Sequence, residues 1–295
     1  MEIDVIIPCY NGEPFIDRCI RSIMSQSILP KRVLFIDDGS TDKSTEIVRG
    51  LQMLFPSLEL HSQENRGLSS ARNLGLRVSS SNLIAFLDVD DYWLPNKLAN
   101  QLDLIQRNLD IFPFGITSNY LLERDGKRSF GISNPPKRPV NSKNLLLFRS
   151  VIPGSGSAVL LPKQIVNHCG YFDENLRYGE DLDYWVRVAK EFLWLTCANR
   201  DVIIFDNAHG IQGSKKNDPE VFKKNSIEIL EKSSPELSRV ESVLIRSYIE
   251  FHTVKLSGSF GSINLMKMIK VIAGFCYGIT IKCDRFLQRF VVLRD

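Results

Sequence analysis

The sequence predicts an α/β fold with a mostly parallel sheet flanked by helices and a helical C-terminal extension. Short apolar runs alternate with longer amphipathic stretches over the first part of the chain. That alternation is typical of β-α-β units, in which helices cover both faces of a parallel sheet. From about Pro219 onward the apolar residues recur at helical spacing, which predicts the extension.

Four apolar runs are the expected strands of the sheet, and amphipathic stretches join them. The strands are expected at 5–7, 32–36, 58–60 and 83–87, and the helices at 15–24, 43–54 and 68–78. Further on, residues 118–123 and 127–132 predict a β-hairpin. A strand is expected at 158–161, and a helix with an apolar face follows Gly179. We therefore expect one large domain at 1–215 and a helical extension at 216–295.

Composition argues against several classes of protein. The chain has 295 residues, of which 43% are hydrophobic and 24% charged, as in ordinary globular proteins. A net charge of +3 without a basic arm argues against a nucleic-acid partner. None of the six cysteines forms a CxxC pair, so a reducing, cytoplasmic compartment is expected and neither a zinc site nor a redox motif is predicted. The N-terminus lacks the basic and apolar regions of a signal peptide.

Polar residues follow three of the expected strands at the point where each strand ends. Tyr10 and Asn11 follow the first strand, Asp37 and Asp38 end the second, and the acidic segment 88–91 follows the fourth. The carboxyl ends of parallel strands meet at one edge, where the ligands of such sheets bind. Each acid alone could instead cap the following helix. Three strand ends of this kind together favour a binding rim.

The strongest local signal is the segment Asp88-Val89-Asp90-Asp91. Carboxylates this close repel one another unless a cation lies among them. Hard oxygen ligands suit Mg²⁺ or Mn²⁺, which commonly join one or two protein carboxylates to substrate phosphates. Asp88 and Asp90 point to the same side if the backbone is extended there. The alternative is a solvated acidic turn before a helix that Pro95 opens.

Six stretches together resemble family 2 glycosyltransferases, which have the GT-A fold. They occur in the family's order with similar spacing over about residues 1–110, and a weaker resemblance extends to about 215. The six are VIIPCYNG (5–12), SIMSQS (22–27), FIDDGSTD (35–42), NRG (65–67), ARNLG (71–75) and FLDVDD (86–91), and the weaker part contains GYFDE (170–174) and GED (179–181). The resemblance implies a catalytic domain at 1–215, with a nucleotide-binding half at 1–110 and an acceptor half at 111–215.

The resemblance assigns residues to the donor side of a site. Tyr10 matches the aromatic residue that stacks near the donor base, and Asp38 matches the acid that accepts a hydrogen bond from that base. Asp88 resembles the residue that reaches the ribose or the metal, and Asp90 resembles the direct ligand of Mn²⁺ or Mg²⁺. Arg72 is expected to contact the donor or to brace the acids, and the alternative is an internal salt bridge. Two neighbours, Pro8 and Val89, complete the implied donor-binding set.

Asp181, in the Glu180-Asp181 pair, resembles the family's catalytic base. An inverting transfer needs one group to take the proton of the acceptor hydroxyl. It also needs charge neutralisation on the departing diphosphate, which a metal ion supplies. The alternative is that Glu180, Asp181 and Asp183 only place favourable charge at a helix N-terminus. His209 lies where many relatives carry a histidine near the diphosphate or metal, and a metal ligand and a structural residue are both open interpretations.

These features predict an inverting glycosyltransferase of the hexosyl or N-acetylhexosaminyl type. The expected donor is a nucleotide sugar linked to UDP, and the expected acceptor is a saccharide or lipid-linked saccharide in surface-glycan biosynthesis. The QxxRW motif of processive polymerases is absent after Asp181, so addition of a single sugar is expected. The alternatives are a catalytically inactive nucleotide-sugar-binding module and a nucleotidyltransferase. The second is disfavoured because 11–14 is not a glycine-rich basic phosphate loop, and a dehydrogenase fails for lack of GxGxxG there.

The C-terminal stretch 262–293 mixes apolar residues with lysines and arginines. One interpretation is a helix on an anionic membrane surface, which would suit a lipid-linked acceptor on the cytoplasmic face. The other is a helix packed on the catalytic domain or on a partner subunit of a homo-oligomer, and we favour this second interpretation. The longest apolar run, 271–281, is too short to span a bilayer.

Overall fold

The computed structural model describes residues 1–124, 126–130, 155–205 and 218–233, with single positions and short stretches between 235 and 253. The chain divides into two compact units, Met1–Lys216 and Asn217–Asp295. His209 and the stretch 262–293 lie outside the described residues, so the predictions made for them are not addressed by the structure.

One sheet forms the centre of the first unit. Within the described residues its strand order is β3-β2-β1-β4-β8-β6-β9-β5, and β7 pairs with β6. The strands are β1 Ile3–Cys9, β2 Arg32–Asp37, β3 Leu58–Ser62, β4 Leu83–Phe86, β5 Tyr92–Trp93, β6 Gly115–Arg124, β7 Lys127–Phe130, β8 Leu160–Pro162 and β9 Trp194–Phe205. β1 pairs in parallel with both β2 and β4, so the carboxyl ends of these three strands lie at one edge.

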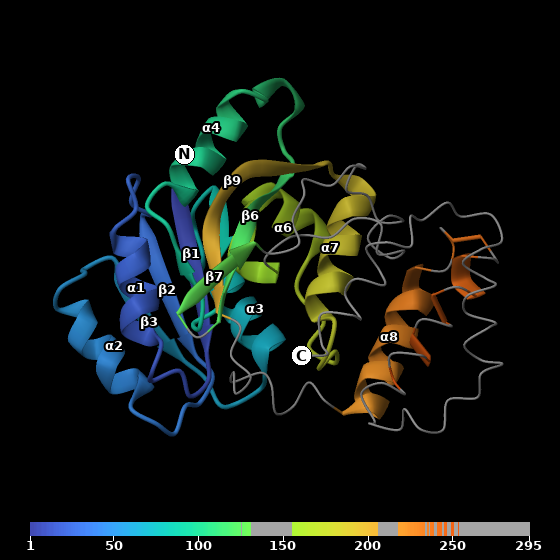
Figure 1. The fold of residues 1–295 in the computed structure, drawn as a ribbon, viewed down its shortest axis with the longest axis horizontal. Coiled ribbons are helices and arrows are strands. Elements are labelled where there is room, and N and C mark those ends of the chain that lie inside the picture. The colour runs from blue at the N-terminus through green and yellow to red at the C-terminus, as the bar shows by residue number, and fades with distance from the viewer. Residues whose placement is uncertain are drawn as a thin grey trace. The chain divides into compact units, whose positions relative to one another are not determined.

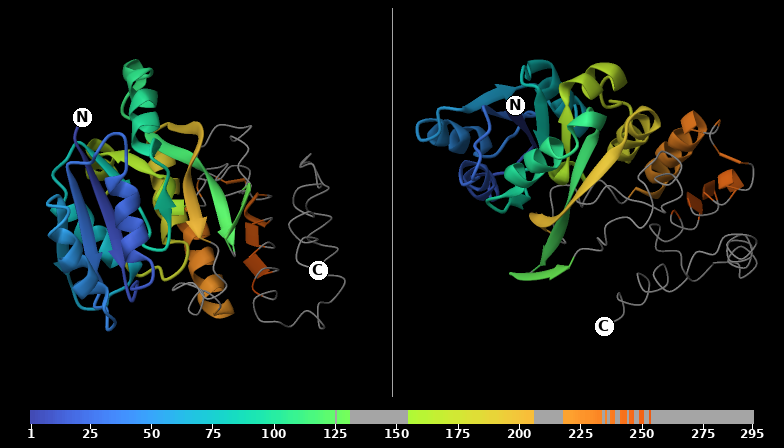
Figure 2. Two further views of the ribbon diagram at one scale, coloured as in Figure 1. Left: turned by 60° about the vertical axis from the view of Figure 1, so that its left-hand side comes forward. Right: turned by 90° about the horizontal axis from the view of Figure 1, so that it is seen from above.

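Helices join the parallel strands and lie on both faces of the sheet (Figures 1 and 2). The chain moves outward from β1 to β3 and then returns to β4, and right-handed crossovers therefore place α3 on the face opposite α1 and α2. The helices described in this unit are α1 Ile16–Met24, α2 Ser44–Gln52, α3 Leu68–Val78, α4 Lys97–Gln106, α6 Lys163–Cys169 and α7 Glu180–Glu191, with 3₁₀ turns η1 Leu109–Ile111 and η2 Ser155–Ala158.

The core lies around β1, whose residues are all buried. A strand covered by helices on both faces has no solvent side, which explains why its apolar run in the sequence is continuous rather than alternating. Gly75 lets α3 approach this strand closely, because a Cβ there would lie 2.5 Å from Cγ2 of Ile6. Cys9 and Cys19 are small members of the same core.

The structure confirms the expected early strands and helices, corrects one later expectation and contains one strand that was not expected. α3 begins and ends where the spacing predicts, and β6 and β7 form the expected hairpin. The strand expected at 158–161 is in fact the end of η2 followed by β8. β9 was not expected at all, because the polar segment Asn199-Arg200-Asp201 interrupts its apolar pattern.

The second unit contains helix α8, Pro219–Ser233. Its buried side chains include Phe222, Ile229 and Leu230. An ion pair of 2.9 Å joins Lys223 on this helix to Glu250. Across the described parts of both units, no helix combines the length and the apolar character that crossing a membrane requires.

Candidate active site

The loop after β1 is joined to the loop after β2 at the carboxyl edge of the sheet. Asn11 adopts the left-handed region with a φ of 54°. Its Oδ1 accepts the N–H of Thr41 at 2.7 Å, and its own N–H donates to Oγ of Ser40 at 2.9 Å. Tyr10, next to Asn11, is half-buried at this edge, whereas Pro8 is buried within β1. The predicted base-stacking residue therefore lies on a loop that hydrogen bonds hold in place.

The Asp38 carboxylate holds a third loop against the end of β2. It is 3% exposed and accepts hydrogen bonds from Nε2 of Gln63 at 2.7 Å and from the N–H groups of Arg66 at 2.9 Å and Gly67 at 2.8 Å. Gly67 has a φ of 94°, which favours glycine. Asp38 is thus already engaged by protein donors, a structural role that the sequence did not suggest.

The segment 88–91 forms a turn and not the extended backbone considered from the sequence. The N–H of Asp91 donates to the carbonyl of Asp88 at 3.0 Å. Oγ of Ser157 accepts the N–H of Asp88 at 3.1 Å and donates to the Asp91 carboxylate, which also accepts the N–H of Phe205 at 3.0 Å. Burial, with the nearby charges of Asp90 and Asp88, raises the pKa of Asp91 well above its usual value. Asp91 is therefore an internal anchor of the turn.

Val89 and Asp90 occupy the tip of this turn. Val89 is buried and lies close to Gly12, where a Cβ would be 3.1 Å from its methyl groups. Asp90 is half-buried, and its carbonyl accepts a hydrogen bond from Nη2 of Arg18 at 2.8 Å. The tip is thereby fixed against the first helix and against the loop after β1.

Arg72 joins the turn to the start of α7. Its side chain is 1% exposed, and its Nη2 lies 2.9 Å from Oδ1 of Asp88 while its Nη1 lies 3.3 Å from Oε1 of Glu180. Burial alone would lower the pKa of Arg72, but the charges of Asp88, Glu180 and Asp181 outweigh it and raise the pKa. The internal salt bridge, one of two interpretations from the sequence, is therefore present.

Asp181 lies in the first turn of α7, and aromatic packing fixes this helix beside β4. Its Oδ1 accepts the N–H of Leu182 at 2.8 Å, and Gly179 before the helix is left-handed with a φ of 74°. Phe86 in β4 contacts the ring of Trp185 in α7 at 6.3 Å between centroids. Because Arg72 bridges Asp88 to the neighbouring Glu180, the acidic turn and the start of α7 lie at the same edge of the sheet.

Asn73, on α3, makes a second connection to the segment that precedes α7. Its Nδ2 donates to the carbonyl of Phe172 at 2.9 Å and to Oε1 of Glu174 at 3.0 Å, and its Oδ1 accepts the N–H of Phe172 at 2.9 Å. Arg66 adds an ion pair of 2.9 Å to Glu174. The ARN and GYFDE stretches are thus direct structural partners.

The carboxylates fit a cation that takes part of its ligands from a substrate. Among the residues that the structure describes, no group of three or more His, Cys, Asp or Glu side chains is arranged to hold a metal ion. Asp88 pairs with Arg72, and Asp91 is buried with Ser157 and Phe205. Mg²⁺ and Mn²⁺ commonly use one or two protein carboxylates together with phosphate oxygens. The donor set suits that arrangement better than a closed protein cage.

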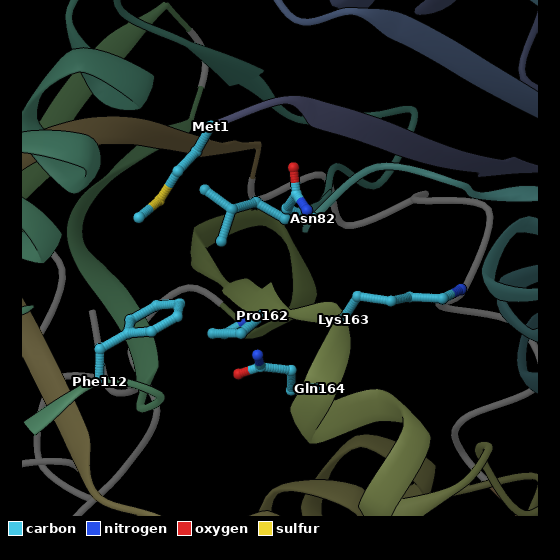
Figure 3. Close-up of a pocket in the computed structure, with 7 residues that line it drawn as sticks. Met1, Asn82, Phe112, Pro162, Lys163 and Gln164 are labelled. Carbon is cyan, nitrogen blue, oxygen red and sulfur yellow. The ribbon is translucent and has the colours of Figure 1, made fainter.

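An apolar hollow lies at the opposite edge of the sheet and is separate from these residues. Met1, Leu83, Phe112 and Pro162 line it, at the amino ends of β1 and β4 (Figure 3). Lys163 also borders it, but its Nζ donates to the carbonyls of Leu76 and Ser79. None of the predicted site residues contributes to this hollow.

Sequence reasoning missed the positioning contacts of Ser157 and Glu180. The small residues of 154–157 were the available signal, because small residues allow close approach of neighbouring groups. A Cβ at Gly156 would lie 3.0 Å from Nη2 of Arg72. Nothing comparable in the sequence pointed to Glu180 as a partner of Arg72.

Comparison with solved structures shows which fold the chain has. Crystal structures of S. aureus TarS 1-349 align with TM-scores of 0.61 in a complex with UDP and 0.64 in a complex with UDP-GlcNAc. The alignments cover 93% of this chain and 79% and 80% of those chains, at 19% sequence identity. This likeness shows the fold, and the expected GT-A-like architecture is confirmed.

The family follows from the sequence match. The model of glycosyl transferase family 2 matches residues 4–167, which is more than half of the chain. The chain therefore belongs to glycosyl transferase family 2, as the quoted stretches predict.

The matches to curated relatives cover different shares of those proteins' lengths. The E. coli protein named UDP-Glc:alpha-D-GlcNAc-diphosphoundecaprenol beta-1,3-glucosyltransferase WfaP is 28% identical over 193 residues, 64% of this chain and 70% of that protein. An uncharacterized glycosyltransferase of Rickettsia bellii is 30% identical over 208 residues, 65% of this chain but 27% of that protein. A second, from Rickettsia typhi, is 27% identical over 219 residues, 71% of this chain and 65% of that protein. The chain thus spans less than two thirds of these two Rickettsia proteins.

Proposed function

We propose that the chain is an inverting glycosyltransferase that moves one sugar from a UDP-linked donor to a hydroxyl of a saccharide or lipid-linked saccharide. The observation that carries this proposal is the Arg72 bridge between Asp88 and Glu180. It brings the donor-side acids and the neighbour of the predicted base to one edge. Family membership supports the transfer chemistry. The UDP and UDP-GlcNAc complexes of TarS, and the donor and acceptor named for the E. coli relative WfaP, support the choice of donor and acceptor class.

The donor base is proposed to bind at the loops after β1 and β2. Tyr10 offers an aromatic face for stacking, and Asp38 offers carboxylate oxygens to an N–H of the base. Pro8 and Val89 are proposed to lie beside the bound donor. Arg72 is proposed to keep Asp88 in place beside the ribose. The role of Asp38 is then double, because the same carboxylate also holds the loop 63–67.

Asp90 is proposed to hold Mn²⁺ or Mg²⁺ at the tip of the acidic turn, with His209 as a second ligand. When bound, the cation supplies positive charge to the departing diphosphate. The hydrogen bond between Ser157 and Asp91 stabilises the turn, and Arg18 donates a hydrogen bond to the Asp90 carbonyl.

Asp181 is proposed to act as the base. Its carboxylate takes the proton of the acceptor hydroxyl while the hydroxyl oxygen bonds to the anomeric carbon. The bond from that carbon to the diphosphate oxygen breaks on the opposite face, which inverts the configuration. Glu180 does not touch the acceptor in this scheme, because its carboxylate is paired with Arg72.

A cytoplasmic site of action completes the proposal. A lipid-linked acceptor would require the enzyme to work at the cytoplasmic face of a membrane. The basic and apolar stretch 262–293 is proposed either to contact that face or to pack on the catalytic domain or on a second copy of the chain. Flotation with anionic liposomes, comparing the full chain with a truncation at Gly258, separates membrane contact from packing.

A thermal-shift panel of nucleotide sugars with Mn²⁺ tests the proposed activity. A bound donor raises the melting temperature by mass action, so UDP-sugars should stabilise the chain more than GDP-, CMP- or dTDP-sugars. Donor hydrolysis by wild type, Asp181→Asn and Asp90→Asn then distinguishes an enzyme from an inactive binding module. Stabilisation by UDP-sugars without any turnover above the two variants would favour the binding module.

A further inference from the structure

Arg18, on α1, contacts the acidic turn at its tip. Its Nη2 donates to the main-chain carbonyl of Asp90 at 2.8 Å. Of the aromatic rings near its guanidinium, the two nearest have their centroids at 4.7 Å, for Tyr92, and at 4.5 Å, for Phe205. Aromatic faces attract cations, so these rings restrict where the guanidinium can lie. Neither ring belongs to α1, and Arg18 therefore joins three separate parts of the unit.

Glu123 fixes the other side of Arg18. Oε1 of Glu123 lies 3.8 Å from Nη1 of Arg18, and its Oε2 accepts hydrogen bonds from Tyr92 at 2.5 Å and from Arg128 at 3.1 Å. Nη2 of Arg128 donates in turn to the hydroxyl of Tyr92 at 3.0 Å. The β6–β7 hairpin thus carries two charged residues that complete a network ending at the Asp90 carbonyl.

The position of this contact matters because the turn contains three carboxylates. Arg72 supplies a positive charge to the turn at Asp88, and Arg18 supplies one at Asp90. A hydrogen bond to the carbonyl also fixes the orientation of the Asp90 peptide, and with it the direction of the Cα–Cβ bond. Residues that orient a metal-binding side chain commonly affect metal affinity without touching the metal.

We propose that Arg18 is a positioning residue, which holds the Asp90 carbonyl so that the Asp90 carboxylate faces a divalent cation, and that Glu123 and Tyr92 hold Arg18. The inference rests on the proposed function, because it assumes that Asp90 binds the cation. It predicts a selective effect on the part of nucleotide binding that depends on metal.

The test compares UDP affinity in Mn²⁺ and in EDTA by isothermal titration calorimetry on the full chain. The variants are Arg18→Gln, Arg18→Lys and Glu123→Gln. The matched control is Arg21→Gln, on the same helix, where the exposed Arg21 forms an ion pair with the exposed Asp17 one turn away. The measured quantity is the ratio of the dissociation constant in EDTA to that in Mn²⁺.

We expect Arg18→Gln to lower this ratio by about tenfold and Glu123→Gln by about threefold, as for other residues that orient metal ligands. Arg18→Lys should retain part of the ratio, because a lysine keeps the positive charge that a glutamine lacks and can still donate to the carbonyl. The dissociation constant in EDTA should stay near that of wild type in every variant, and Arg21→Gln should match wild type in both conditions. General destabilisation would instead weaken binding equally with and without metal.

Two results would overturn the inference in distinguishable ways. A wild-type chain whose UDP affinity does not respond to Mn²⁺ would remove the proposed cation role of Asp90, and the inference with it. A metal response in wild type that Arg18→Gln and Glu123→Gln retain in full would leave the proposed function standing and reject the positioning role of Arg18 alone.

Discussion

Arg72 and Glu180 are 108 positions apart in the sequence, yet Nη1 of Arg72 lies 3.3 Å from Oε1 of Glu180. The same guanidinium holds Asp88 at 2.9 Å. One buried cation therefore neutralises two acids, one beside the predicted metal ligand and one beside the predicted base. Removing either acid leaves Arg72 with one of its two ion pairs, whereas removing Arg72 leaves two carboxylates without their shared cation.

Glu180→Gln should lower turnover more than it weakens donor binding. A glutamine still accepts a hydrogen bond from Arg72 but loses the charge that fixes the start of α7. We expect the kcat to fall about 10- to 100-fold, as for small displacements of a reacting group, with UDP affinity within about twofold of wild type. Steady-state kinetics and calorimetry measure both quantities. Glu191→Gln, at the exposed far end of the same helix, is the control, and an equal loss of kcat there would contradict the explanation.

Asp38→Asn should destabilise the fold as well as weaken UDP binding. The carboxylate accepts three hydrogen bonds from Gln63, Arg66 and Gly67, and an amide NH₂ would face one of these donors. We expect a loss of about 1–3 kcal/mol in the free energy of unfolding. Urea denaturation measures it, with the exposed Asp103→Asn as control. Weakened UDP binding at unchanged stability would show that the loop contacts contribute nothing.

Local patterns in the sequence predicted the early strands and helices because a strand buried on both faces and an amphipathic helix each leave a clear periodic signal. The segment Leu68–Val78 is the best example. The same reasoning left open whether 88–91 is extended or a turn, because a backbone hydrogen bond from Asp91 to Asp88 and a contact with the distant Ser157 shape this segment. β9 escaped prediction because its polar centre breaks the pattern, and its pairing with β6 contains register shifts.

The candidate site was predictable in its residue types but not in its internal contacts. Strand ends located Tyr10, Asp38 and the acidic turn on one edge, as parallel pairing of β1 with β2 and β4 requires. The Arg72–Glu180 pair could not be found in this way, because no periodicity links residues so far apart. The roles of the individual residues in binding and catalysis stay predictions.

Lys97→Met should stabilise the protein near neutral pH. Lys97 is fully buried, and its Nζ has no hydrogen-bond partner among the residues that the structure describes. Its Nζ lies 3.8 Å from the ring centroid of Trp93. Burial lowers the pKa of Lys97 from 10.5 to about 7, although Cys197 and Asp201 oppose the shift. Between these two pKa values the unfolded chain binds more protons than the folded chain. The stability of the wild type should therefore rise with pH across this window.

Lys97→Met removes this pH dependence. The free energy of unfolding should rise by about 1–4 kcal/mol at about pH 6 and by less at about pH 9.5. Urea unfolding of both proteins at the two pH values measures the gain. A loss of stability at both would mean that the contact with Trp93 outweighs the cost of burying the ammonium group.

Asp4→Asn should reduce stability near neutral pH and weaken the response to acid. The buried Asp4 carboxylate forms a 2.7 Å ion pair with Arg32 and accepts hydrogen bonds from Ser79 and Ser81. Burial alone would raise the pKa of Asp4, but these partners lower it from 3.8 to about 2. Its stabilisation is therefore complete above the ordinary pKa and is lost as the pH falls through about 2.

We expect Asp4→Asn to cost about 2 kcal/mol near neutral pH, and the exposed Asp17→Asn to cost less than about 0.5 kcal/mol. Denaturation at about pH 7 and about pH 3 checks both the size and the sign. Equal costs for the two substitutions would contradict the assigned pKa shift of Asp4.

The most direct test of the central claim separates binding from turnover in Asp181→Asn. The account predicts that this variant binds UDP in Mn²⁺ with wild-type affinity while sugar transfer falls about 10²- to 10⁴-fold, because only the proton acceptor is lost. Asp90→Asn should instead lose the gain in UDP affinity that Mn²⁺ provides. Wild-type transfer by Asp181→Asn, or loss of its UDP binding, would contradict the division of roles between Asp90 and Asp181.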